Sequence, residues 1–485
     1  MAIQFVFSDL LLTSPMIAIF LMSLVPITLK VLRNNQEPPG IVTLGWGLIG
    51  IVASIALLIV FGGADHGAFN NTLLFDGLSQ WMGIIALVSA GAAMIMMYEN
   101  PSTNGRQFSE LIFLTMSSAL GMLILVSAVD LILVFIGVEM MSLSLYLMIA
   151  MSHEEKLSKE AAFKYFVLGG LASAVFLYGT AFLYGTAGSV NILGIAEQAG
   201  SLIQSNQLFL VGILFVVIGF CFKVSIAPFH AWTPDVYQGA PTPHTAFMAT
   251  AVKTVSFAAL MRVIATHSLI SSENLLDVLQ WLAVITMIVG NVAAIIQKNF
   301  KRMLAYSSIG HSGYILVGVI AMGVSNQGVF GASGVVFYLL SYSLMTLGTF
   351  AIVSMMERSE DHVVSVDDLA GLSKRRPLLS FCLAMFLLSL AGLPPTLGFF
   401  GKFYVFSAAL NEGLVWLALW GVINSVISVY YYLRPIVLMY MSDGEGEIAA
   451  HPLPATTVTV VIAAVLIGLL GLVSGPIFSA IEKSF

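Results

Sequence analysis

The sequence predicts an all-α polytopic membrane protein with about 14 transmembrane helices. Of its 485 residues, 59% are apolar and only 9% are charged, and the mean hydropathy is +0.97. Soluble domains are about 45–50% apolar and about 25% charged, which excludes an ordinary soluble globule. The apolar residues form runs of roughly 20 residues, the length that crosses a bilayer as a helix. The period-two alternation of a transmembrane barrel is missing from these runs.

The spans follow one another with short polar breaks. In chain order they are predicted at 10–33, 40–62, 77–98, 108–127, 128–152, 163–186, 207–239, 241–266, 275–297, 302–324, 328–356, 376–410, 414–441 and 455–480.

Two of the spans are too long to be plain helices. Spans 207–239 and 376–410 would each measure roughly 50 Å as unbroken helices. The first contains Pro228 and the second contains Pro394 and Pro395. Proline lacks an N–H group and clashes with the preceding turn, so both helices are predicted to break inside the membrane.

Broken helices at matching places in two halves are typical of transporters built from inverted repeats. The order of features therefore predicts two inverted five-helix repeats, each with one broken helix. The predicted units are three N-terminal helices in 1–107, a first repeat in 108–266, a second in 275–441, and a C-terminal helix in 442–485.

The basic residues predict the orientation. With fourteen crossings, thirteen of the nineteen Lys and Arg residues fall on one side, whereas Lys483 and Arg262 fall on the other. The rich side is cytoplasmic by the positive-inside rule, so both termini are expected outside the cytoplasm. Residues 1–14 lack a basic region and a cleavage site, so the first run is predicted to be a retained helix. The thirteen residues are Lys30, Arg33, Arg106, Lys156, Lys159, Lys164, Lys298, Lys301, Arg302, Arg358, Lys374, Arg375 and Arg376.

Three functional classes are disfavoured by the sequence. Cys221 and Cys382 are far apart and lack the spacing of zinc or iron–sulfur ligands, so no metal or redox cofactor is expected in this chain. The basic residues form no dense block, so nucleic acid is not an expected partner. The segment Gly45–Gly50 spells G-x-G-x-x-G, but it lies in an apolar span without a preceding strand, so it does not indicate dinucleotide binding.

Charged residues inside the spans are the main functional signal. Subtracting the loops leaves Lys223, Lys253, Lys402 and Arg434, with Glu139 as the one carboxylate well inside a span. A central Lys or Arg costs about 2.5–3.5 kcal/mol, so three lysines and a glutamate cost on the order of 10 kcal/mol if they are unpaired. Such residues normally face the bundle interior and mark ion or proton pathways.

The lysines lie beside the breaks. Lys223 precedes Pro228 by five residues, and Lys402 directly follows Gly401. Burial disfavours the charged form of a lysine, whereas a nearby carboxylate such as Glu139 favours it. A lysine in this setting is therefore predicted to gain and lose a proton. The structural alternative is one ion pair that fixes helix packing, which leaves the other two lysines unexplained.

Histidines and two further lysines are secondary candidates. His230, within the first break, and His311 are predicted as proton relays, with a hydrogen-bonded structural histidine as the alternative. For His244, a role in a loop or helix cap is an equal alternative. Lys164 and Lys301 are candidate proton uptake points, although Lys164 fits a solvated i,i+4 pair with its neighbouring glutamate and Lys301 fits a topogenic charge.

Together these segments resemble a known family. The run Phe222–Pro243 resembles the most recognisable stretch of the antiporter-like membrane subunits of respiratory complex I, the proton-translocating NADH:quinone oxidoreductase. Supporting matches are Ile136–Tyr146, Lys301–Tyr314 and Ala391–Lys402, and the resemblance covers roughly residues 75 to 440. The family contains three similar members. The stop at Phe485, without a long lateral helix, and the lysine rather than glutamate on the second broken helix favour one of them.

The resemblance implies a function. It gives proton-relay roles to Glu139, Lys223, Lys253, Lys402, His230 and His311, with Glu139 and Lys223 as a modulating pair. It implies a subunit of the bacterial cytoplasmic membrane that works beside other membrane-arm subunits, including further antiporter-like ones. FMN, iron–sulfur clusters and quinone are then expected in partner subunits. The alternatives are a subunit of a multisubunit Na⁺/H⁺ antiporter and a passive scaffold subunit.

Overall fold

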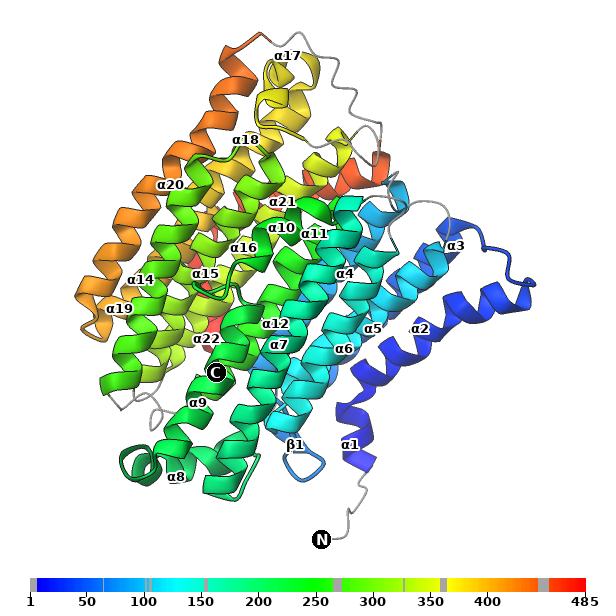
Figure 1. Cartoon of the computed structure of the whole chain (residues 1–485). Coiled ribbons are helices and arrows are strands. Elements are labelled where there is room, and N and C mark those ends of the chain that lie inside the picture. Colours follow the sequence, from blue (N-terminus) through cyan, green and yellow to red (C-terminus); the bar gives the residue numbers. More distant parts are fainter. Residues whose placement is uncertain are drawn as a thin grey trace.

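The computed structural model is a bundle of long helices (Figure 1). It describes residues 7–63, 65–100, 103, 107–151, 156–264, 273–325, 328–357, 364–443 and 453–485. Within these ranges the helices that match the predicted spans are α2 (Ser14–Leu32), α3 (Gly40–Phe61), α4 (Gly77–Glu99), α5 (Phe108–Ser127), α6 (Leu131–Ala150), α7 (Lys156–Ala187), α9 (Gln207–Lys223) with α10 (Trp232–Gly239), α11 (Thr242–Phe247) with η1 (Met248–Val252) and α12 (Lys253–Ile264), α14 (Glu273–Ile295), α15 (Phe300–Val324), α16 (Val329–Met356), α18 (Pro377–Ala391) with α19 (Leu397–Asn411), α20 (Val415–Met441), and α21 (Pro454–Leu472) with α22 (Ser474–Glu482).

The helical, membrane-spanning fold class is confirmed. Among the described residues, twelve helices are long and apolar enough to cross a membrane. Helix also occupies the two long spans that were predicted to break. The exact number of crossings and the inverted repeats stay predictions.

Both broken helices break where the prolines predict. The first helix ends at Lys223 and resumes at Trp232, and the second ends at Ala391 and resumes at Leu397. The prolines of both breaks are exposed on the bundle, whereas the neighbouring lysines are buried. The breaks therefore place the end of α9 and the end of α18 next to buried lysine side chains.

The structure corrects the expected helices at three places. Span 241–266 contains a π-helical segment, η1, directly before Lys253. Span 455–480 is interrupted at Val473. An amphipathic helix that the spans did not include, α8 (Ile192–Ser205), buries Ile192, Ile195 and Ala199. Further elements outside the predicted spans are α1 (Phe7–Leu12), η2 (Asp367–Leu369), α17 (Leu372–Arg375) and the antiparallel strands β1 (His66–Ala68) and β2 (Leu73–Phe75).

The first and last described segments approach the same part of the bundle, near β1 and the start of α4. Helix α1 packs against β1, and the Trp81 indole N–H donates to Ser484 Oγ at 3.0 Å near the start of α4. At this end Arg262 forms an ion pair with Asp76 at 2.7 Å, as expected for a basic residue on the termini side. Two of the thirteen residues predicted for the other end, Arg106 and Arg358, lie outside the described residues.

Candidate functional site

Lys223 lies at the first break, as the last residue of α9. Its ammonium donates to Ser142 Oγ on α6 at 2.9 Å and lies 3.4 Å from the hydroxyl of Tyr146. The rings of Tyr146, Tyr165 and Phe222 surround it at 5.6–5.8 Å. Only 4% of Lys223 is exposed. Hydroxyl oxygens and aromatic faces therefore solvate this buried cation.

Glu139 lies close to this lysine but does not touch it. Its carboxylate accepts a hydrogen bond from Ser173 on α7. The ion pairs of the described residues, defined by nitrogen–oxygen distances of at most 4.0 Å, do not join Glu139 to Lys223. The expected modulating pair is thus not a contact ion pair in this structure.

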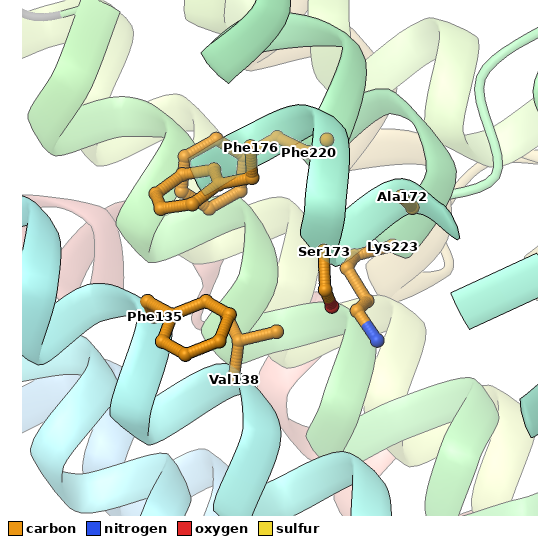
Figure 2. A pocket seen from close by; sticks show the side chains of 8 residues that line it. Phe135, Val138, Ala172, Ser173, Phe176, Phe220 and Lys223 are labelled. Atoms are coloured by element: carbon orange, nitrogen blue, oxygen red, sulfur yellow. The ribbon is translucent and has the colours of Figure 1, made fainter. Parts of the chain in front are cut away.

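A small cavity lies beside Lys223 and Ser173, the hydrogen-bond partner of Glu139. Its volume is about 10 Å³, and Ser173 and Lys223 line it together with Val138, Phe135 and four other residues (Figure 2). Figure 2 shows the Ser173 hydroxyl and the Lys223 ammonium extending in the same direction from neighbouring helices. Such a volume is close to the size of one water molecule, but most of the residues that line it are apolar.

Lys253 opens α12 directly after the π-helical segment. Its ammonium donates to the Ser308 carbonyl at 2.6 Å and to the Ser308 hydroxyl. The Tyr342 hydroxyl donates to the same Ser308 oxygen at 2.8 Å, and its ring lies 5.1 Å from the ammonium. Helix π-bulges are frequent at functional sites, and this one ends at the central lysine.

His311 lies one turn after Ser308 on α15, between two tyrosines. Its Nδ1 is 2.7 Å from the Tyr338 hydroxyl on α16, and its Nε2 is 2.9 Å from the Tyr432 hydroxyl on α20. Tyr432 also hydrogen-bonds Ser307. A neutral imidazole donates through one nitrogen and accepts through the other, so this ring is placed to pass a proton between two hydroxyls.

Lys402 lies at the second break, on α19. Its ammonium donates to the carbonyl of Ala391, the last residue of α18, at 2.8 Å and to Ser425 Oγ at 2.9 Å. The last carbonyls of a helix lack partners and carry partial negative charge, so the broken end of α18 stabilises a cation. Gly392 makes the approach possible: its φ is +85°, and an added Cβ would lie 2.9 Å from the Lys402 side chain.

The polar end of the bundle holds the two candidate uptake points. Lys164 is partly exposed and pairs with Glu160 at 2.7 Å and with Asp235 at 2.8 Å. Lys301 is buried, donates to the Ala240 carbonyl at 2.7 Å and lies 3.4 Å from the Glu357 carboxylate.

His230 and Arg434 complete the candidate set. His230 is half-buried within the first break, and its Nδ1 has no hydrogen-bond partner in the described ranges. Arg434 lies within α20, a helix long and apolar enough to cross a membrane, and its position relative to the membrane stays a prediction. Its guanidinium reaches the Gln297 carbonyl at 3.3 Å and Asp367 at 3.5 Å, because the long side chain extends to the polar end of α20.

Comparisons with known proteins agree on one family. Residues 128–428 match the family described as NADH:quinone oxidoreductase/Mrp antiporter, TM. The chain belongs to this antiporter-like family. A relative from Bdellovibrio bacteriovorus named NADH-quinone oxidoreductase subunit N is 70% identical over 477 residues, which are 98% of each chain. A relative of the same name from Trichlorobacter lovleyi is 42% identical, over 83% of this chain and 82% of the relative.

Solved structures give the same result. A chain of respiratory complex I from Thermus thermophilus superposes with a TM-score of 0.82 at 33% identity, over 96% of this chain and 99% of that chain. A chain of the Mrp complex from Dietzia superposes with a TM-score of 0.80 at 19% identity, over 99% and 97% of the two chains, which shows a shared fold alone. The choice among the three similar family members is confirmed, since the curated relatives are subunit N chains.

Sequence reasoning missed the tyrosines of this antiporter-like chain. Tyr338 and Tyr342 are buried four residues apart on α16, and Tyr432 is buried on α20. The i,i+4 spacing on one helix face was the available signal. Tyr342 hydrogen-bonds Ser308 beside Lys253, and Tyr338 and Tyr432 hydrogen-bond His311, whose ring lies 5.0 Å from that of Tyr342.

Proposed function

We propose that this chain is a proton-translocating membrane-arm subunit of NADH:quinone oxidoreductase. Protons pass through it by way of buried lysine, glutamate and histidine side chains, joined by hydroxyls and water. The driving energy comes from quinone reduction elsewhere in the complex. The observation that carries this proposal is a series of three ammonium groups, each at most 5% exposed, at two helix breaks and a π-bulge. The relatives of this chain that are named NADH-quinone oxidoreductase subunit N support the assignment to this complex.

Energetics favour a transport role over a packing role. The three buried lysines cost on the order of 10 kcal/mol as isolated charges. Hydrogen bonds to charged groups return about 1.5–3 kcal/mol each, and each ammonium has hydroxyl or carbonyl acceptors. The cost of burying each ammonium and the free energy of its hydrogen bonds are therefore similar in size, so neither the charged nor the neutral form of the lysine is strongly favoured. A proton that crosses 100 mV requires about 2.3 kcal/mol, which is within the same range.

The order of groups suggests a route. Lys164 and Lys301 are proton uptake points at the basic, cytoplasmic end of the bundle. Lys223 with Glu139 acts in the first half channel, 108–266, and Lys253 connects it to the second, 275–441. His311 and its tyrosines lead toward Lys402, which releases the proton at the end that carries both termini. That end faces the periplasm, by the positive-inside rule. His230 is a further relay at the first break.

The partners follow from the same assignment. Neighbouring membrane-arm subunits, including other antiporter-like ones, cover part of the exposed apolar surface, and lipid covers the rest. FMN, iron–sulfur clusters and quinone are held by partner subunits.

Replacing Lys223 in the assembled complex tests the proposal. In Lys223→Ala we expect fewer protons pumped per electron and slower coupled turnover, measured with NADH and quinone in proteoliposomes. Lys374→Ala is the matched control, because this lysine is exposed at the polar end and pairs with Asp443. Normal pumping in Lys223→Ala contradicts the proposal.

A second variant and the set of co-purifying subunits separate the alternatives. A passive scaffold predicts that Glu139→Ala lowers the amount of assembled complex and leaves the proton stoichiometry of the remainder unchanged. A multisubunit Na⁺/H⁺ antiporter predicts co-purification without redox subunits and activity that depends on Na⁺.

A further inference from the structure

His244 is a buried imidazole without a hydrogen-bond partner among the described residues. It lies in the first turn of α11, and its exposed fraction is 0%. Both ring nitrogens are buried, and neither has a hydrogen-bond partner among the residues that the structure describes. The α11 N-terminus has no side-chain cap hydrogen bond, so His244 does not have the cap role considered from the sequence.

A dry imidazole in this position is unfavourable. A neutral imidazole carries one donor and one acceptor, and each buried group without a partner costs about 1–3 kcal/mol. Buried polar side chains in proteins almost always bind protein groups or ordered water. A phenylalanine or leucine would fill the same place without that cost. The histidine therefore points to water at both ring nitrogens.

The segment around His244 is already polar on one side. The Lys301 ammonium donates to the Ala240 carbonyl at 2.7 Å, and the Thr242 hydroxyl donates to the Glu357 carboxylate. Lys301 and Glu357 form an ion pair at 3.4 Å, with 9% and 12% of their side chains exposed. This pair lies at the border between the polar end and the buried start of α11, where water has charged groups to bind.

We propose that His244 is a proton carrier on the inlet of this chain, joined by ordered water to the Lys301–Glu357 pair. This inference rests on the proposed function and adds a residue to it. Lys253 lies nine residues further along the same helical run, roughly 13 Å at the α-helical rise. In this proposal, water molecules bridge the gap between His244 and Lys253. The imidazole takes a proton on one ring nitrogen from the inlet water and releases a proton from the other nitrogen toward Lys253.

Three variants in the assembled complex test this role. His244→Phe removes both ring nitrogens at similar size, and His244→Gln keeps hydrogen bonding but does not carry a proton at neutral pH. Thr43→Val is the matched control, because Thr43 Oγ1 is also buried without a partner, on the distant helix α3. Proton pumping and coupled turnover are measured in proteoliposomes, and a high-resolution electron microscopy map of the unaltered complex is inspected for water at His244.

The expected results are specific. His244→Phe lowers coupled turnover on the order of tenfold, below the roughly 10²–10⁴-fold range of general acid–base groups because water retains a slower route. His244→Gln recovers only part of the loss, and Thr43→Val pumps normally. The map shows water within hydrogen-bond distance of the ring.

Several outcomes overturn the inference. Normal pumping in His244→Phe overturns the inference. If Lys253→Ala is impaired while His244→Phe pumps normally, the proposed function stands without His244. Normal pumping in both variants refutes the proposed function as well. If His244→Phe fails to assemble, a map with a dry imidazole refutes the inference and a map with ordered water supports it.

Discussion

Tyr432 gives the sharpest test of the second half of the route. Its hydroxyl is 2.9 Å from His311 Nε2 and also bonds Ser307, all within the buried core. Tyr432→Phe removes this hydroxyl and keeps the ring, so the imidazole and the serine each lose a partner. A buried polar group left without a partner costs about 1–3 kcal/mol, which corresponds to about 5- to 150-fold in an equilibrium or rate.

If protons pass through His311, this loss falls on the transfer step. We expect coupled NADH:quinone turnover in proteoliposomes to fall by at least about fivefold, and uncoupled electron transfer to change less. The matched control is Tyr430→Phe on the same helix, because Tyr430 is 61% exposed and faces away from the core. Tyr432→Phe that assembles fully and pumps within about twofold of the unaltered chain refutes the His311 route.

Two further predictions concern the first half and the basic end. Ser173→Ala removes the hydrogen bond to the Glu139 carboxylate, so the number of protons pumped per electron should fall. Ser173→Thr keeps a hydroxyl and should restore this number. Equal loss in both variants contradicts a role for the Ser173 hydroxyl in proton transfer. Burial raises the pKa of Glu37, but hydrogen bonds from Lys30 at 2.6 Å and Ser109 at 2.8 Å outweigh it and hold the pKa below its usual value. A carboxyl group whose pKa is lower in the folded state stabilises the folded protein at a pH above its unfolded-state pKa, about 4.3. This contribution disappears as the pH falls through the folded-state pKa. Glu37→Gln should therefore lower the melting temperature in detergent at pH 7, and this decrease should disappear only at a pH below the lowered folded-state pKa of Glu37. The same decrease at both pH values is inconsistent with this reasoning.

The broken helices were predictable because proline acts locally. Pro228, Pro394 and Pro395 interrupt the hydrogen-bond ladder whatever surrounds them, and the lysines beside them are conspicuous because charge is costly in a bilayer. The structure places Lys223 and Lys402 at these breaks, buried and hydrogen-bonded.

The hydroxyl network was not predictable in the same way. Placing a tyrosine in an apolar span costs little free energy, so the sequence alone does not distinguish Tyr338 and Tyr432 from ordinary packing residues. Their meeting at His311 depends on the rotation of α16, α15 and α20 against one another, which one sequence does not specify. For Arg434 the charge was visible in the sequence, but the reach of its side chain to Asp367 was not. Helix α8 was recoverable, since Ile192, Ile195 and Ala199 follow helical spacing.

The lysines at the two helix breaks have different surroundings. The hydrogen-bond acceptors of Lys402 are a backbone carbonyl and a serine hydroxyl, both neutral. Lys223 instead lies across a small cavity from Ser173, which holds the Glu139 carboxylate. At an effective dielectric of about 20, bringing an anion from about 7 to about 4 Å of a cation adds about 2 kcal/mol of attraction. That is close to the roughly 2.3 kcal/mol needed to move a charge across 100 mV. In the proposed function, a movement of Glu139 on α6 toward α9 would therefore strengthen its attraction to the Lys223 ammonium, whereas the two acceptors of Lys402 are neutral.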